Sequence, residues 1–134
     1  MGILKKALIG AAALAALAAC GTTEEAMQEE GATQLAKWEI EATLNDSTRE
    51  WASGNGHSYY APDGAYLWKM NNGTTGDGTW RVNDADQMCF TVDEWFNGVE
   101  QCYTMYKKPD GQIVSIGPKG KEHKLGAYQE GNTL

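Results

Sequence analysis

Two histidines are the first residues to test for chemistry. His57 precedes two tyrosines, and Asp63 lies close enough along the chain to orient it as a general base. A hydrolase built on this pair also needs a nucleophile in a strained, exposed turn, and the sequence has no Gly-x-Ser-x-Gly or comparable motif. We therefore expect His57 to face solvent or cap a turn, and His123 to be exposed in a charged segment near the C-terminus.

Carboxylates gather near a tryptophan in residues 93–100. Asp93, Glu94 and Glu100 surround Trp95, and a pair of carboxylates beside an aromatic ring is the arrangement that glycosidases use. On a surface loop of an acidic protein, the same residues are usually charges that keep the protein soluble. We expect the second role, no catalytic residues and no enzyme, with a hydrolase as the less favoured alternative.

Metal and phosphate motifs are incomplete. Asn83, Asp84 and Asp86 offer oxygen ligands for calcium, but the segment lacks the glycine and distal glutamate of a twelve-residue calcium loop. The glycine-rich residues 71–78 lack the lysine and following helix of a phosphate loop. The cysteines and histidines show neither Cys-x-x-Cys nor His-x-x-x-His spacing. We expect no metal and no cofactor.

Aromatic residues are the most suggestive feature. The chain has 5 Trp and 6 Tyr against 2 Phe, so rings with a polar group predominate. Such rings suit stacking on glycans or protein interfaces, and equally suit a thin sheet with a partly wet core. We expect Trp80 and Tyr103 in the core. Four further rings are the candidate binding surface: Trp51, Tyr59, Trp68 and Trp95.

The N-terminal residues predict where in the cell the protein is located. Lys5 and Lys6 precede an uncharged, mostly apolar run over residues 7–19, which is the pattern of a secretory signal and too short to span a membrane. Residues 17–20, "LAAC", resemble the lipobox of bacterial lipoproteins. That resemblance implies cleavage before Cys20 and diacylglyceryl attachment to it, with further acylation such as palmitate. The alternative is an ordinary signal peptide with Cys20 incidental.

Acyl chains at Cys20 would hold the protein on a membrane. We expect a periplasm-facing location in the bacterial cell envelope, with the outer membrane favoured because Gly21 stands where a retention-type aspartate would keep many lipoproteins at the inner membrane.

Charge and length limit the partners and the domain count. With 11 Lys and Arg against 18 Asp and Glu, the formal net charge is -7, which argues against nucleic acid as a partner. The remaining chain fits one small domain. We expect four regions: a signal peptide at 1–19, an acidic flexible tether at 20–32, a β-domain at 33–116 and a polar tail at 117–134 that frays.

The number of cysteines is consistent with a location in the bacterial cell envelope. If Cys20 carries lipid, Cys89 and Cys102 remain as a pair, and an oxidising envelope favours a disulfide between them. Such a bridge closes a short loop and is worth about 3 kcal/mol in the chain-entropy model.

Helical spacing is confined to one segment. Leu35, Trp38, Ile40 and Leu44 suit an amphipathic helix within residues 32–46, with Thr33 placed to cap it. The alternation of apolar residues leaves a strand possible, and we favour the helix.

From Arg49 onward, short apolar and aromatic segments alternate with turn sequences, two of which contain Pro-Asp-Gly. Connections this short join antiparallel neighbours. The sequence therefore predicts a mainly β fold, a small antiparallel meander forming a half-barrel or barrel of about six or seven strands with one short N-terminal helix. The predicted strands cover residues 49–53, 57–61, 65–70, 78–82, 87–92, 101–107 and 112–116.

The block from Tyr59 to Gly111 resembles a family of small secreted bacterial proteins known only as a domain of unknown function. Asn45 and Asp46 depart from that family's pattern, and the resemblance implies a fold but no activity. The matching positions are Tyr60, Asp63, Gly64, Gly78, Thr79, Trp80, Arg81, Cys89, Trp95, Cys102 and Tyr103.

These observations together favour a lipid-anchored envelope protein with a non-enzymatic binding or structural domain, whose partner is an envelope protein. The alternative is a module that binds glycan or peptidoglycan through exposed Trp and Tyr. Oligomeric state is left open.

Overall fold

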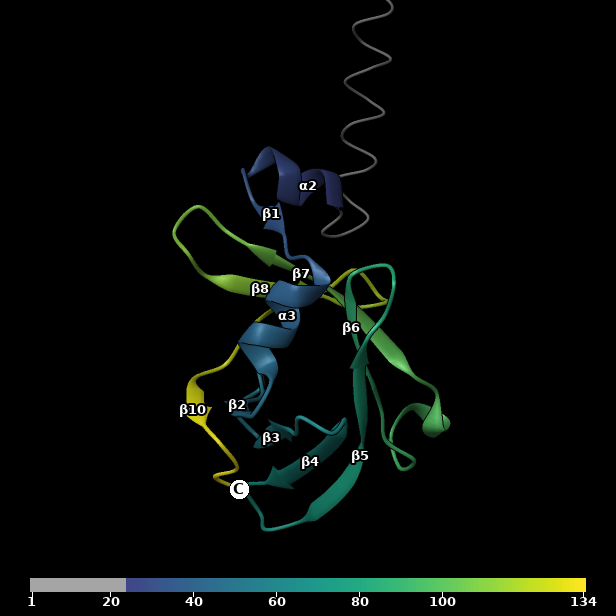
Figure 1. Ribbon diagram of the computed structural model, residues 1–134. Helices are drawn as coiled ribbons and strands as arrows, with labels where there is room; N and C mark the ends of the chain where they lie inside the picture. The colour runs from purple at the N-terminus through teal and green to yellow at the C-terminus, as the bar shows by residue number, and fades with distance from the viewer. Residues whose placement is uncertain (1–23) are drawn as a thin grey trace, which may run out of the picture.

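A single antiparallel sheet dominates the protein. The computed structural model describes residues 24–134, so the predicted signal peptide and Cys20 lie outside the described residues. The described chain forms a 10-stranded sheet that curls into a half-barrel (Figure 1). The prediction of a mainly β, antiparallel half-barrel is confirmed, with more strands than the six or seven expected.

The central strands follow one another as a meander, each paired with the next along the chain. Every predicted strand segment overlaps one of them. Gly64 and Gly111, in the two Pro-Asp-Gly turns, have φ of 93° and 89°, a conformation that glycine adopts without strain. The strands are β2 (Ser47–Glu50), β3 (Gly56–Tyr60), β4 (Ala65–Met70), β5 (Thr75–Val82), β6 (Gln87–Thr91), β7 (Gln101–Lys107) and β8 (Ile113–Ile116).

Three short polar strands were not expected. β1 (Thr33–Gln34) pairs with β7, β9 (Glu122–Lys124) pairs with β8, and β10 (Tyr128–Glu130) pairs with β2. The prediction that residues 117–134 fray is therefore wrong for both strands they contain. Backbone hydrogen bonds to the outer strands hold this segment, and these bonds need no apolar side chain.

The predicted helix exists but begins later than expected. Helix α3 (Lys37–Leu44) follows Ala36, whose backbone N–H donates to the Glu39 carboxylate at 3.0 Å. Thr33 does not cap it, because that residue is already paired in β1. Ile40 and Leu44 are fully buried in the core of the half-barrel, whereas Trp38 is 71% exposed.

The described part of the predicted tether is folded. Helix α2 (Glu24–Glu29) lies next to β7 and β8 (Figure 1). Its Met27 is completely buried in a cluster with Tyr106 of β7 and Val114 of β8. Glu30 adds an ion pair to Lys108 at 3.6 Å. One buried methionine holds a stretch that is otherwise too polar to form a core. Among residues 24–134 no helix is long and apolar enough to span a membrane.

Aromatic rings fill the concave side of the sheet. Tyr60 contacts Tyr66 and Trp80 edge-on, with ring centroids 5.4 Å apart in each pair, and Tyr66 stacks on Phe90 at 5.3 Å. Trp80 is 8% exposed and its indole N–H donates to the Ala61 carbonyl, so its expected core position is confirmed. Tyr103 is only partly buried.

Candidate binding cleft

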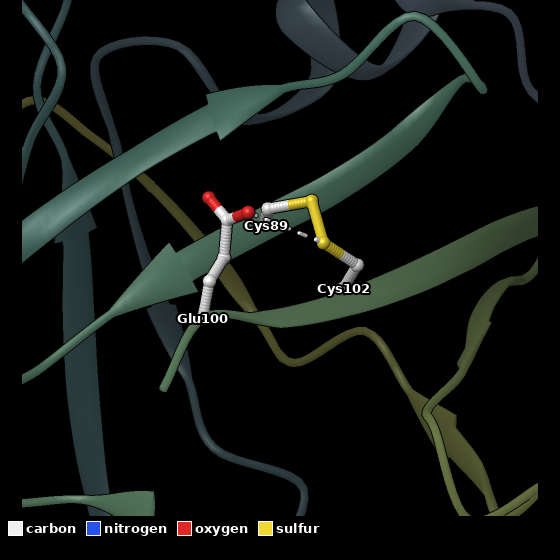
Figure 2. A group of neighbouring side chains, drawn as sticks. All are labelled: Cys89, Glu100 and Cys102. Carbon is white, nitrogen blue, oxygen red and sulfur yellow. Dashed lines mark hydrogen bonds between the residues drawn. A yellow bond between two sulfur atoms is a disulfide. The ribbon is translucent and has the colours of Figure 1, made fainter. Parts of the chain in front are cut away.

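The disulfide pins the two strands that flank the longest loop of the meander. Cys89 of β6 and Cys102 of β7 are directly opposite in the register and are joined by the predicted bond, with Cα atoms 4.1 Å apart (Figure 2). The Asn83 side-chain nitrogen lies 3.4 Å from Cys89 Sγ. Because a slip by one residue would move each side chain to the other face, the bond fixes which residues of β6 and β7 face inward.

Glu100 lies beside this bond, as Figure 2 shows, but its carboxylate accepts hydrogen bonds from another residue. Arg81 donates to both of its carboxylate oxygens at 2.8 Å, and this contact lowers the pKa of Glu100. The two sulfurs and a Glu100 oxygen come within 4.8 Å of one another. With the sulfurs bonded to each other there is no thiolate to bind a metal, so this group stabilises the hairpin.

The loop between β6 and β7 carries two rings over the sheet. It contains a short 3-10 turn, η1 (Phe96–Gly98), in which Phe96 and Asn97 adopt φ of 53° and 56°. The Trp95 N–H donates to the Val92 carbonyl at 3.0 Å, which closes the turn that leads into η1. Trp95 and Phe96 are thereby placed against the aromatic side of the sheet.

Three of the four candidate ring residues meet in one cluster. The Trp95 ring lies 4.7 Å from Trp68 and 5.5 Å from Trp51 between centroids. Trp68 is only 5% exposed and forms the floor of the cluster, whereas Trp51 and Trp95 are partly exposed. Tyr59 lies apart from them, where its hydroxyl donates to Asp46 at 2.7 Å.

Trp51 and Trp95 border an open cleft of about 590 Å³. Its walls are almost entirely aromatic or apolar, and its size lies within the range of small-molecule sites. The lining residues are Trp51, Ala52, Ser53, Tyr66, Met70, Phe90, Trp95, Phe96, Tyr103 and His123.

A smaller cavity of about 160 Å³ continues the cleft inward. The two spaces share lining residues, among them Trp51, Phe90 and Tyr103. The inner cavity is also lined by Arg49, whose guanidinium donates to the carbonyls of Thr43 and Gly126 at 2.8 and 3.3 Å. The half-barrel therefore has an aromatic mouth and a charged inner end.

Hydrogen bonds fix two rings in the wall of the cleft, Trp51 and Tyr66. The Trp51 indole N–H donates to Ser58 Oγ at 2.6 Å, and Ser58 Oγ in turn bonds the Tyr66 hydroxyl. Burial raises the pKa of Tyr66 to about 12, so the phenol stays protonated. The rings on this wall are held in place by polar contacts as well as by packing.

The residues considered for catalysis are not gathered into one site. His57 lies 3.7 Å from Glu50, and the Asp63 carboxylate instead accepts the Ala65 N–H at 2.9 Å within its own turn. Asp93 and Glu94 are exposed on the loop, while Glu100 bonds Arg81.

Two of the three residues considered for calcium, Asn83 and Asp86, have other partners. Asn83 Oδ1 accepts the N–H groups of Ala85 and Gln87, and Asp86 Oδ1 accepts the Lys37 N–H, each at 3.0 Å. These contacts cap a turn and link it to the start of α3.

Arg49 and His123 are site residues that sequence reasoning missed. His123 lies in β9 with its ring 6.2 Å from Tyr103, so it lines the cleft instead of extending into solvent from a frayed tail. For Arg49 a signal was present, because strand alternation places it on the same face as Trp51 two residues later. For His123 none was, because its strand is short and polar.

The geometry defines a small half-barrel with a disulfide-pinned aromatic cleft. A family model described as "Protein of unknown function (DUF995)" matches residues 7–109, and the chain belongs to this family. No curated protein and no solved structure matches the chain.

Proposed function

We propose that this chain is a lipid-anchored protein of the bacterial cell envelope, and that its domain is a non-enzymatic module that binds a ligand in the aromatic cleft. The anchor rests on the "LAAC" sequence ending at Cys20. The binding role rests on one observation, the open cleft of about 590 Å³ whose walls are aromatic and apolar. An open apolar hollow of this kind exposes rings to water unless something covers them.

The cleft fits a small molecule better than a flat protein partner. Concave, mostly apolar hollows with a few polar groups are typical of small-molecule sites. Here the polar groups are Ser53, Tyr103 and His123, spread among rings. Trp95 and Phe96 come from a loop with no regular structure beyond one short turn, and such loops commonly carry binding residues on a rigid scaffold.

Binding is tested by tryptophan fluorescence titration of the purified protein with amphiphiles and with soluble peptidoglycan fragments. We expect a saturable change that is reduced at least tenfold in affinity by Trp95→Ala. Trp38→Ala is the matched control, because Trp38 is 71% exposed on α3 and does not line the cleft. Affinity unchanged by Trp95→Ala, in a variant that remains folded by circular dichroism, would remove the cleft as the binding site.

Glycan binding is the second candidate. It is favoured by the partly exposed rings of Trp51 and Trp95 at the mouth, because sugars stack on such surfaces. Saturation by peptidoglycan fragments and not by amphiphiles would select it.

A further inference from the structure

The inner cavity holds a positive charge without a carboxylate partner. Arg49 lies in β2 on the same face as Trp51, and its guanidinium carbon sits 4.8 Å from the Tyr128 ring centroid. Within residues 24–134 no acidic side chain forms an ion pair with it. Its contacts are two backbone carbonyls and one ring, which reduce the cost of burying the charge without cancelling it.

Glu50 and Lys124 also line this cavity, but strand alternation directs their side chains to the other face of the sheet. Glu50 follows Arg49 in the strand, so its side chain points to the opposite face, where it meets His57. Lys124 alternates in the same way with His123, whose ring packs on Tyr103. In a chain of net charge -7, the inside of the half-barrel therefore carries a local positive charge.

Hydrogen-bond donors without acceptors surround the same cavity. The Arg49 Nε–H is buried and has no partner. Within the described residues the hydroxyls of Tyr60 and Tyr103, which also line the cavity, form no hydrogen bond. Burial raises the pKa of both tyrosines, so each phenol keeps its proton. The Arg49 Nε–H is thus a fully buried donor without an acceptor, and the two hydroxyls are further donors beside the same space.

Ser115 and His123 are further polar residues of the lining, and most of the remaining residues are apolar. Leu44, Met88, Phe90 and Met105 complete the inner cavity, and the cleft continues outward between rings. A ligand that fits must pair a small anionic acceptor with an apolar body. Sugars would leave most of their hydroxyls unpaired against these walls.

We propose that the cleft binds a carboxylate-headed amphiphile, with its carboxylate beside Arg49 and Tyr60 and its hydrocarbon chain between Trp51, Trp95 and Phe96. The inference deepens the proposed function and rests on it. A carboxylate has the size for the inner cavity of about 160 Å³, and its two oxygens match the geometry of guanidinium donors. The aromatic rings at the mouth of the cleft then cover the hydrocarbon chain of the ligand.

The test compares ligands that differ only in the head group. Binding of dodecanoate, dodecanol and dodecylammonium, each below its micelle concentration, is measured by tryptophan fluorescence and by calorimetry on the purified protein. We expect dodecanoate to bind at least tenfold more tightly than dodecanol, because a charge-assisted hydrogen bond is added. Arg49→Gln should reduce this ratio to about one, and Arg49→Lys should keep part of it.

Two further variants keep the test decisive. Arg81→Gln removes an exposed arginine that lines neither the cleft nor the inner cavity, and it should leave the ratio unchanged. Tyr60→Phe removes only a hydroxyl and should weaken dodecanoate several-fold without affecting dodecanol, which decides the matter if Arg49→Gln does not fold.

Equal affinity for dodecanoate and dodecanol would overturn the carboxylate site while leaving the cleft as a binding site. Preference for dodecylammonium would overturn it too. If none of the three binds, the amphiphile proposal fails, and the Trp95→Ala titration with peptidoglycan fragments decides separately whether the cleft binds anything.

Discussion

Gly76 shows how closely the aromatic floor is fitted. A Cβ atom at this position would lie 2.2 Å from the Trp68 ring, far inside contact distance. The glycine in β5 therefore leaves the room that the indole occupies beneath Trp95. Its role is steric and needs no unusual backbone angle.

We expect Gly76→Ala to lower the free energy of unfolding by about 1 to 3 kcal/mol, because the methyl group displaces Trp68 from a packed site. Urea denaturation followed by tryptophan fluorescence measures it. Asp77→Ala is the control, since Asp77 is its exposed neighbour in the same strand. Equal stability of the two variants would contradict the packing described for Trp68.

The buried phenol of Tyr66 makes the free energy of unfolding depend on pH in the alkaline range. Burial raises its pKa from 10.0 to about 12 in the folded protein. Its contribution is fully present below pH 10 and is lost as pH rises toward 12, because only the unfolded chain ionises readily in that window. A shift of this size corresponds to about 3 kcal/mol.

Denaturation curves at pH 8 and pH 11.5 test this. We expect the wild-type protein to lose more stability between the two than Tyr66→Phe does, although Tyr60, whose pKa is raised as well, continues to contribute in the variant. An identical loss in both proteins would mean that Tyr66 titrates normally.

The hairpin of β6 and β7 is the element that holds the mouth of the cleft. Its disulfide closes a loop with a sequence separation of 13, and Trp95 and Phe96 lie inside that loop. The bond therefore affects both stability and the position of the rings.

Replacing both cysteines, as Cys89→Ala with Cys102→Ala, should cost about 3 kcal/mol and weaken ligand binding in the cleft. Chemical denaturation and the fluorescence titration measure the two effects. If affinity survives the exchange unchanged, strand pairing alone positions Trp95.

At the level of elements, the sequence predicts well where apolar residues recur and poorly where the backbone alone decides. The seven central strands were recognisable because aromatic and β-branched residues stand between turn sequences. β1, β9 and β10 carry residues such as Gln34, Glu122 and Glu130, which leave no periodic pattern. Met27 was a single apolar residue in an acidic stretch, so its burial depended on a partner surface that the sequence does not reveal.

The candidate site follows the same division. Trp51, Trp68 and Trp95 were selected by residue type, and their meeting depends on strand register and on the fold of one loop. Tyr59 was selected by the same criterion, but it lies away from the cleft beside Asp46. Composition identifies the rings, and only register says which of them share a face.

For the whole molecule, the proposed anchor and the folded N-terminal segment act together. α2 packs on β7 and β8 from residue 24 onward, and Cys20 precedes it by four residues. Four extended residues span at most about 14 Å. An acylated Cys20 would therefore hold the domain close to the membrane.

Cys20→Ser should release the protein from membranes into the soluble periplasmic fraction, because no acyl chain is attached. Fractionation and immunoblotting of cells expressing either form measure it, and mass spectrometry of the wild-type protein identifies the acyl group. Membrane association of the Ser variant equal to that of the wild type would remove the lipid anchor.

The segment from Glu122 to Glu130 supplies both outermost strands of the sheet, β9 on one side and β10 on the other. Exposed sheet edges are templates for edge-to-edge aggregation, and three-residue, charged edge strands suppress it. The protection of both sheet edges depends on this one short segment. Gly126 within it lies so close to Glu50 that a Cβ atom at position 126 would be 1.8 Å from the Glu50 carbonyl oxygen. Proteolytic cleavage there would weaken both edges together, so we expect a single nick to make the domain prone to aggregation.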